Sequence, residues 1–301
     1  MTFTIHSYTA ADGMELRYGL LTSSHDAVLA PPHRGMVFVP GLGGSVKNSL
    51  VFFNALLQHF NPIVVPDLRG FGLNDSHPLP HPKQFVSDLA CVGNQVVPQY
   101  FSEMPWTLGG ISLGGCVVSH WLGGARSKIA PDSAWLLAPA VKEHPDAFQW
   151  PYVAKALWTM LIAPSSLVQL PYGLESLTTN PAVLASEQHQ QHMTNFRIPA
   201  RFLWKLRAFN RSAVKAYPSI ELPVHLTVPL SDQIICPAAM EASFQKLPSH
   251  SLHQCKKYEG LYHDVSLEIG MRGVVDDLAA WCRMLDADKL GSLLNVSASV
   301  V

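Results

Sequence analysis

The sequence predicts an α/β fold in which a mostly parallel central sheet is flanked by helices. Short apolar runs alternate with longer helical patterns along the 301 residues, which is typical of strands joined by covering helices. At 48% hydrophobic and 14% charged residues, the chain can bury a large core and is too apolar to be disordered. A G-x-S-x-G turn at residues 110–114 lies between a predicted strand and a predicted helix.

Five apolar runs predict buried strands: Met36–Val39, Pro62–Val65, Trp106–Gly109, Ala134–Leu137 and Val224–Val228. Near the amino terminus, alternation around Phe3–His6 and Met14–Tyr18 predicts an antiparallel edge pair, turned at Asp12-Gly13. Helical spacing predicts helices at about 46–60, 83–100, 114–126, 237–247 and 271–286.

Residues 141–216 break this alternation. They show helical spacing and contain no convincing strand, so we expect a helical cap inserted between two core strands. A structureless loop of that length is the less favoured alternative, because such loops are rare. The core then consists of residues 1–140 and 217–288. The small and polar residues of 289–301 predict a flexible tail.

Charge and cysteine usage exclude several classes of protein. A net charge of −1 provides no basic field for nucleic acid and no polybasic membrane anchor. The first residues form neither a cationic start nor a long apolar run, and the five cysteines are scattered without a CxxC pair. Both features predict a cytoplasmic protein with reduced thiols. The most apolar stretch, residues 153–170, is interrupted by Lys155 and Pro164 and is too broken to span a bilayer.

The G-x-S-x-G turn predicts Ser112 as a nucleophile. A tight turn between strand and helix forces the serine into a strained conformation and projects its hydroxyl above the sheet edge, at the positive end of the following helix. A structural glycine turn with an incidental serine is less favoured, because Gly109 and Gly115 extend the glycine-rich pattern on both sides.

A serine nucleophile needs a histidine base that a carboxylate orients, in the chain order serine, acid, histidine. His263 follows the last predicted strand and precedes the C-terminal helix, so we predict it to be the base. Asp232 lies on the loop after the penultimate strand and is the predicted acid; a turn or cap aspartate is the alternative. Asp264 is too close to His263 along the chain to orient its ring.

Acyl transfer also needs donors for an oxyanion, and we predict the backbone N–H groups of Leu42 and Leu113. The glycine-rich loop at residues 40–45 has a rival interpretation as a phosphate cradle, but it lacks the lysine of that motif. His189 and His192 are spaced like metal ligands on a helix, but no third ligand is suggested nearby, which favours a solvated pair. The predicted chemistry needs no metal or organic cofactor.

Four segments carry a family resemblance: Val39–Gly44, Pro66–Gly72, Gly110–Gly114 and Tyr258–His263. They resemble the α/β-hydrolase superfamily and, within it, most closely the monoacylglycerol lipase/lysophospholipase group of serine aminopeptidase S33 type. The resemblance extends to about Leu285 and includes the cap. In that group Y-x-G-x-Y-H ends with the catalytic histidine, which implies the same role for His263.

The sequence departs from the group's pattern in three places. Pro40 stands where the oxyanion loop usually has histidine, although a backbone donor does not need that side chain. Apolar residues, Leu68, Phe71 and Leu73, stand around the Asp67 motif where polar ones are usual. Gln188–His192 replaces an acidic cap motif. These departures leave the particular substrate open.

The resemblance implies hydrolysis of carboxylic esters through an acyl-enzyme, on a small-molecule or lipid ester such as a monoacylglycerol. Two alternatives remain: amide, thioester or carbon–carbon hydrolysis on the same scaffold, and a non-catalytic receptor. Trp158, Met160 and Leu170 lie in apolar cap segments that either line an acyl tunnel, touch a membrane surface transiently, or pack the cap onto the core. The sequence does not separate these roles, and it leaves the oligomeric state unknown.

Overall fold

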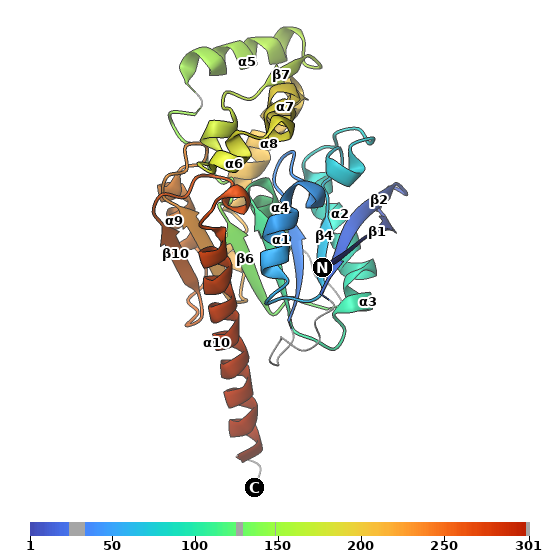
Figure 1. Cartoon of the computed structure of the whole chain (residues 1–301), viewed down its shortest axis with the longest axis vertical. Helices are drawn as coiled ribbons and strands as arrows, with labels where there is room; N and C mark the ends of the chain where they lie inside the picture. Colours follow the sequence, from blue (N-terminus) through green and yellow to red (C-terminus); the bar gives the residue numbers. More distant parts are fainter. Residues whose placement is uncertain (24–33, 125–128, 148, 299–301) are drawn as a thin grey trace.

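The computed structural model describes residues 1–23, 34–124, 129–147 and 149–298. This part of the chain forms an eight-stranded sheet in the order β1-β2-β4-β3-β5-β6-β9-β10 (Figure 1). The strands are β1 (Thr2–Thr9), β2 (Glu15–Thr22), β3 (Gly35–Val39), β4 (Ile63–Pro66), β5 (Trp106–Ile111), β6 (Ser133–Leu137), β9 (Val224–Pro229) and β10 (Gln254–Tyr258). All neighbours from β4 to β10 run parallel, as predicted.

The two N-terminal strands form the predicted antiparallel pair, with Thr9 opposite Glu15. Gly13 in the turn has a φ of +82°, a left-handed conformation that glycine adopts without steric cost. β2 also pairs antiparallel with β4, so this hairpin forms one edge of the sheet.

Helices cover both faces of the sheet (Figure 1). α1 (Leu50–Leu56) and α10 (Met271–Ala298) pack on one face, and α2 (Lys83–Gln95), α4 (Leu113–Gly124) and α9 (Pro237–Phe244) on the other. Successive residues of β3 alternate between the two cores: Met36 and Phe38 contact the first, Val37 and Val39 the second. Short helical segments connect these elements: α3 (Val97–Tyr100) and 3-10 turns at Val46–Ser49, Gly72–Asn74, Leu174–Ser176, Tyr217–Ser219 and Val265–Leu267.

The segment between β6 and β9 forms a layer above the sheet (Figure 1). Its elements are α5 (Trp150–Ile162), β7 (Leu167–Gln169), α6 (Pro181–Leu184), α7 (Glu187–Asn195), β8 (Arg197–Pro199) and α8 (Ala200–Ala213). The expectation that this segment holds no strand is wrong, because β7 and β8 pair antiparallel. Each has three residues, which is too short to give a readable alternation.

α10 extends well past the body of the molecule (Figure 1). Residues 289–298 of the predicted flexible tail are helical and belong to α10, and whether they are flexible stays a prediction. Residues 299–301 of that tail lie outside the described part. No proline follows Asp288, so nothing in the sequence stops a helix that has already begun. Within the described residues, no helix combines the length and the apolar character needed to cross a membrane.

Candidate active site

The residues that the sequence predicts to be catalytic meet beyond the carboxyl ends of the parallel strands, beneath the inserted layer. β3 lies between β4 and β5, so the winding of the chain reverses there. Ligands of open parallel sheets bind at such a switch point, beyond the carboxyl ends of the strands. Ser112 directly follows β5, whereas Asp232 follows β9 and His263 follows β10. Three distant parts of the sequence therefore contribute to one site.

Ser112 has a φ of 54°, in the left-handed region that costs a non-glycine residue about 1–3 kcal/mol. The turn is held by its backbone: the Ser112 N–H donates to the carbonyl of Leu137, and the Ser112 carbonyl accepts from Ala140 N–H, each at 3.0 Å. A Cβ on Gly114 would lie 2.1 Å from the carbonyl oxygen of Val39, and one on Gly110 would lie 2.6 Å from the backbone of Gly114. The glycines of the motif are thus required by close packing of backbone.

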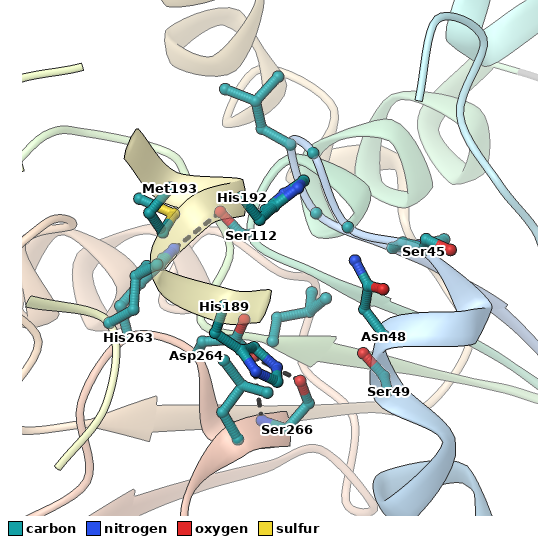
Figure 2. A pocket seen from close by; sticks show the side chains of 18 of the residues that line it. Ser45, Asn48, Ser49, Ser112, His189, His192, Met193, His263, Asp264 and Ser266 are labelled. Atoms are coloured by element: carbon teal, nitrogen blue, oxygen red, sulfur yellow. Dashed lines mark hydrogen bonds between the residues drawn. The ribbon is translucent and has the colours of Figure 1, made fainter. Parts of the chain in front are cut away.

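A chain of hydrogen bonds joins the three side chains. His263 Nε2 lies 2.8 Å from Ser112 Oγ, and His263 Nδ1 lies 2.6 Å from Asp232 Oδ2 (the first bond is dashed in Figure 2). An ionised carboxylate only accepts, so Nδ1 donates to Asp232. In the neutral ring Nε2 is then the acceptor, and the Ser112 hydroxyl donates to it. This is the tautomer that a general base needs.

Asp232 is fixed on its other oxygen. Asp232 Oδ1 accepts hydrogen bonds from the backbone N–H groups of Ile234 and Ile235, both at 2.8 Å. The side chains of Asp232 and His263 are buried. Burial, the largest influence, lowers the pKa of His263, but the charge and hydrogen bond of Asp232 outweigh it, so the pKa lies above its ordinary value. The carboxylate thereby stabilises the protonated ring.

Asp67, buried at the end of β4, supports the glycine-rich loop after β3. Its carboxylate accepts from the N–H groups of Val46, at 2.8 Å, and Leu73, at 2.9 Å. Burial raises the pKa of Asp67 to about 6, although these hydrogen bonds oppose the shift. Asp67 precedes Ser112 in the chain, so the order serine, acid, histidine does not predict it as the acid of the site. Its place directly after a buried strand was the available signal.

Two cavities open from Ser112. The first, about 120 Å³ in volume, is here called the polar chamber and includes His263 in its wall (Figure 2). The name refers to the polar side chains on one part of its wall, Asn48, Ser49, His189, Asp264 and Ser266; the rest of the wall is apolar and includes Phe52, Phe53 and Leu174. The second, about 90 Å³, is the apolar chamber; its lining includes Leu113, Val153, Ala156, Leu203, Leu206 and Ile234. Leu42, Leu170 and Tyr172 border both chambers beside Ser112.

The two residues predicted to supply the oxyanion donors line the cavities beside Ser112: Leu42 lines both chambers and Leu113 lines the apolar one. Leu113 is the first residue of α4, so the N–H of Leu113 has no partner within the helix. Leu170 also lines both chambers, as a substrate-binding role requires. Trp158 and Met160 line neither chamber, so their substrate-binding role stays a prediction. Helical spacing in an apolar segment does not reveal which face of the helix points inward.

His189 and His192 of α7 both line the polar chamber (Figure 2). His189 Nδ1 lies 2.9 Å from Ser186 Oγ. His192 packs its ring against Phe196, with ring centroids 5.8 Å apart. Across the described residues, no group of three or more His, Cys, Asp or Glu side chains is arranged to hold a metal.

Comparison with known proteins places this site in a family. The family model of the S33 serine aminopeptidases, a hydrolase family, matches residues 30–270. A monoacylglycerol lipase from Mycolicibacterium smegmatis is 23% identical over 282 residues, which cover 92% of this chain and 95% of that protein.

Solved structures show the same architecture. A soluble variant of monoglyceride lipase from Saccharomyces cerevisiae, in complex with a substrate analogue, superposes with a TM-score of 0.77 at 20% identity, covering 93% of this chain and 94% of that one. A monoacylglycerol lipase from Paleococcus ferrophilus gives 0.65 at 17% identity, covering 93% and 100%. The chain therefore has the α/β-hydrolase fold and belongs to the S33 serine aminopeptidase family of hydrolases.

Proposed function

We propose that the protein is a serine esterase that cleaves lipophilic carboxylic esters, of which monoacylglycerols are one class, through an acyl-enzyme on Ser112. The observation that carries this proposal is the hydrogen-bond chain from Asp232 through His263 to Ser112, at the junction of a polar and an apolar chamber. The names of the similar proteins, monoacylglycerol and monoglyceride lipases, agree with it.

In the proposed reaction, His263 Nε2 takes the Ser112 hydroxyl proton as Oγ attacks the ester carbonyl carbon. The N–H groups of Leu42 and Leu113 donate to the resulting oxyanion. His263 then gives the proton to the leaving alcohol oxygen, and the carbon–oxygen bond breaks to leave Ser112 acylated. Water, deprotonated by His263, attacks the acyl-enzyme and releases the acid. Asp232 stabilises the imidazolium in both halves.

The two chambers orient the substrate. The leaving oxygen must receive a proton from His263, so the alcohol lies on the side of that residue, in the polar chamber. The acyl chain then enters the apolar chamber, whose wall consists largely of aliphatic side chains. A substrate with a polar alcohol and an apolar acyl group fits both halves, as a monoacylglycerol does.

The proposal is tested with p-nitrophenyl esters of increasing acyl length, beside matched amide and thioester substrates. We expect ester turnover that rises from acetate toward longer chains, because each methylene buried in the apolar chamber adds about 0.8 kcal/mol of binding. Faster cleavage of the amide or the thioester would replace the ester assignment. No turnover of any substrate would favour the non-catalytic receptor.

The rise of kcat/KM with pH is expected to have its midpoint above pH 6.5. Protonated His263 cannot accept the serine proton, so activity is lost as pH falls through the pKa of His263, and that pKa is raised above its ordinary 6.5. The charge of Asp264 contributes to the raised pKa, so Asp264→Asn should move the midpoint to lower pH. A wild-type midpoint at or below 6.5 would contradict this electrostatic account.

Filling the apolar chamber should select against long acyl groups. Ala156 of α5 lines this chamber, so Ala156→Trp is expected to lower kcat/KM for the laurate ester at least about tenfold. Acetate does not reach that wall and should change little. Lys155→Trp, an exposed position on the same helix, is the matched control. Equal losses for laurate and acetate would place the acyl group elsewhere.

We further propose that α5 contacts a lipid surface. Trp158, Leu161 and Ile162 follow helical spacing and are 64%, 71% and 64% exposed, at the end of the cap farthest from the sheet (Figure 1). The double variant Trp158→Ser/Leu161→Ser should co-sediment several-fold less than the wild type with phosphatidylcholine vesicles, whereas Val51→Ser should co-sediment as the wild type does. Unchanged sedimentation of the double variant would remove α5 from the contact.

We also propose that the protein is cytoplasmic. All five cysteines are free thiols, which suits a reducing compartment.

A further inference from the structure

The backbone N–H groups on both sides of His263 donate hydrogen bonds to other segments of the chain. The N–H of Tyr262, one residue before His263, donates to Glu268 Oε1 at 3.2 Å. The N–H of Asp264, one residue after it, donates to the carbonyl of Leu177 at 2.8 Å. The position of the imidazole therefore depends on where Glu268 and Leu177 lie.

Leu177 belongs to the cap segment 177–180, and the same segment also holds Glu268. Thr179 donates twice to the Glu268 carboxylate, from its N–H to Oε1 at 3.0 Å and from its hydroxyl to Oε2 at 2.9 Å. Asn180 Nδ2 donates to the carbonyl of Leu267 at 2.8 Å. Glu268 is thus an acceptor shared between the cap and the loop that carries His263.

Glu268 is only 3% exposed. Removing a carboxylate from water is costly unless hydrogen bonds replace its hydration, and here the donors come from Thr179 and Tyr262. A hydrogen bond to an ionised acceptor is stronger than one between neutral groups. Displacement of the cap segment would break both hydrogen bonds from Thr179 and leave the buried carboxylate with fewer donors. Movement of the cap relative to the loop that carries His263 is therefore costly in free energy.

The carboxyl end of the cap segment leads to the helices that line the polar chamber. Asn180 begins α6 by accepting the N–H of Ala182, and α7 follows with His189, His192 and Met193 in the wall of the polar chamber. A ligand that moves α7 acts on residues 177–180 through this short connection. These residues in turn bond both neighbours of His263, directly at Asp264 and through Glu268 at Tyr262.

We propose that Glu268 and Thr179 form a clamp that makes the alignment of His263 with Ser112 depend on the position of the cap, so that Glu268 is a positioning residue for the base. This inference rests on the proposed function. It assigns no contact between Glu268 and the substrate. Its consequence is that a change in the cap, remote from the reacting atoms, alters the rate of proton transfer.

The test uses Thr179→Val, which removes the hydroxyl donor while the shape of the side chain and the backbone N–H remain. With p-nitrophenyl acetate, a substrate with a minimal acyl group, we expect kcat to fall about tenfold at nearly constant KM, because small misplacements of a catalytic group are costly. Thr179→Ser retains a hydroxyl and should restore kcat. Thr159→Val is the matched control, since that cap hydroxyl donates to Lys155 in its own helix.

A second readout does not depend on turnover. The Nδ1 proton that His263 shares with Asp232 is observable by proton NMR, and we expect Thr179→Val and Glu268→Gln to shift or broaden its resonance, whereas Thr159→Val leaves it unchanged. A protein without esterase activity but with this shift would refute the proposed function and retain the clamp. An unchanged resonance, or a higher KM for long esters with unaltered kcat, would overturn the clamp. Thermal unfolding of each variant identifies any that fails to fold.

Discussion

Ser112→Ala is expected to lose ester turnover by a factor on the order of a million, the effect of removing the nucleophile from a serine hydrolase. The loss should appear in kcat, because the hydroxyl forms its new bond only in the reaction, whereas both chambers still bind substrate. Residual catalysis of about 10³–10⁴ over water should remain from the oxyanion donors and from binding.

Ser112→Ala should leave the fold unchanged. Alanine has a Cβ like serine, so the strain at a φ of 54° is already present in the native turn, and the backbone hydrogen bonds of residue 112 do not involve the hydroxyl. Ser219→Ala, an exposed serine remote from the site, is the matched control and should retain full activity. Turnover by Ser112→Ala above about one per cent of wild type would contradict the assignment.

Asp232→Asn is expected to lower kcat about ten-thousand-fold. The asparagine oxygen can still accept the N–H groups of Ile234 and Ile235, so the side chain should stay in place. Its NH₂ then faces His263 Nδ1, which must become an acceptor. The ring proton consequently moves to Nε2, where it points at the Ser112 hydroxyl and blocks proton transfer.

Steady-state kinetics above the pKa of His263 measure this effect, because the imidazole is neutral there in the wild type. Asp276→Asn, which changes a surface carboxylate 71% exposed beside His59, controls for the loss of one negative charge. A fall of less than about tenfold for Asp232→Asn would show that another group orients the ring. Asp264 is the adjacent carboxylate to examine in that case.

The core and the predicted catalytic residues could be read from the sequence because each leaves a local signal. Buried parallel strands appear as apolar runs such as Ala134–Leu137, and the glycines around Ser112 mark a turn that permits no Cβ at two positions. The parallel order of strands then brings loops together that are distant in sequence. His263 and Asp232 could therefore be predicted from their places after the last two strands.

The features that were not predicted depend on tertiary contacts. The pairing of β7 with β8 joins three-residue segments thirty positions apart, and no local pattern encodes it. The sequence left three roles open for Trp158 because it shows the apolar character of α5 but not the orientation of the helix, which exposes this side chain. Nothing in the sequence around Glu268 predicts its hydrogen bond with Thr179, because Thr179 lies 89 positions earlier in the chain.

Fluorophosphonate labelling followed by peptide mapping tests most directly whether Ser112 is the nucleophile. The reagent reacts with a serine only when a base activates its hydroxyl, so the geometry of His263 predicts one adduct, on the peptide that contains residue 112, and none in Ser112→Ala. An adduct on another residue, or labelling that persists in Ser112→Ala, would contradict the account.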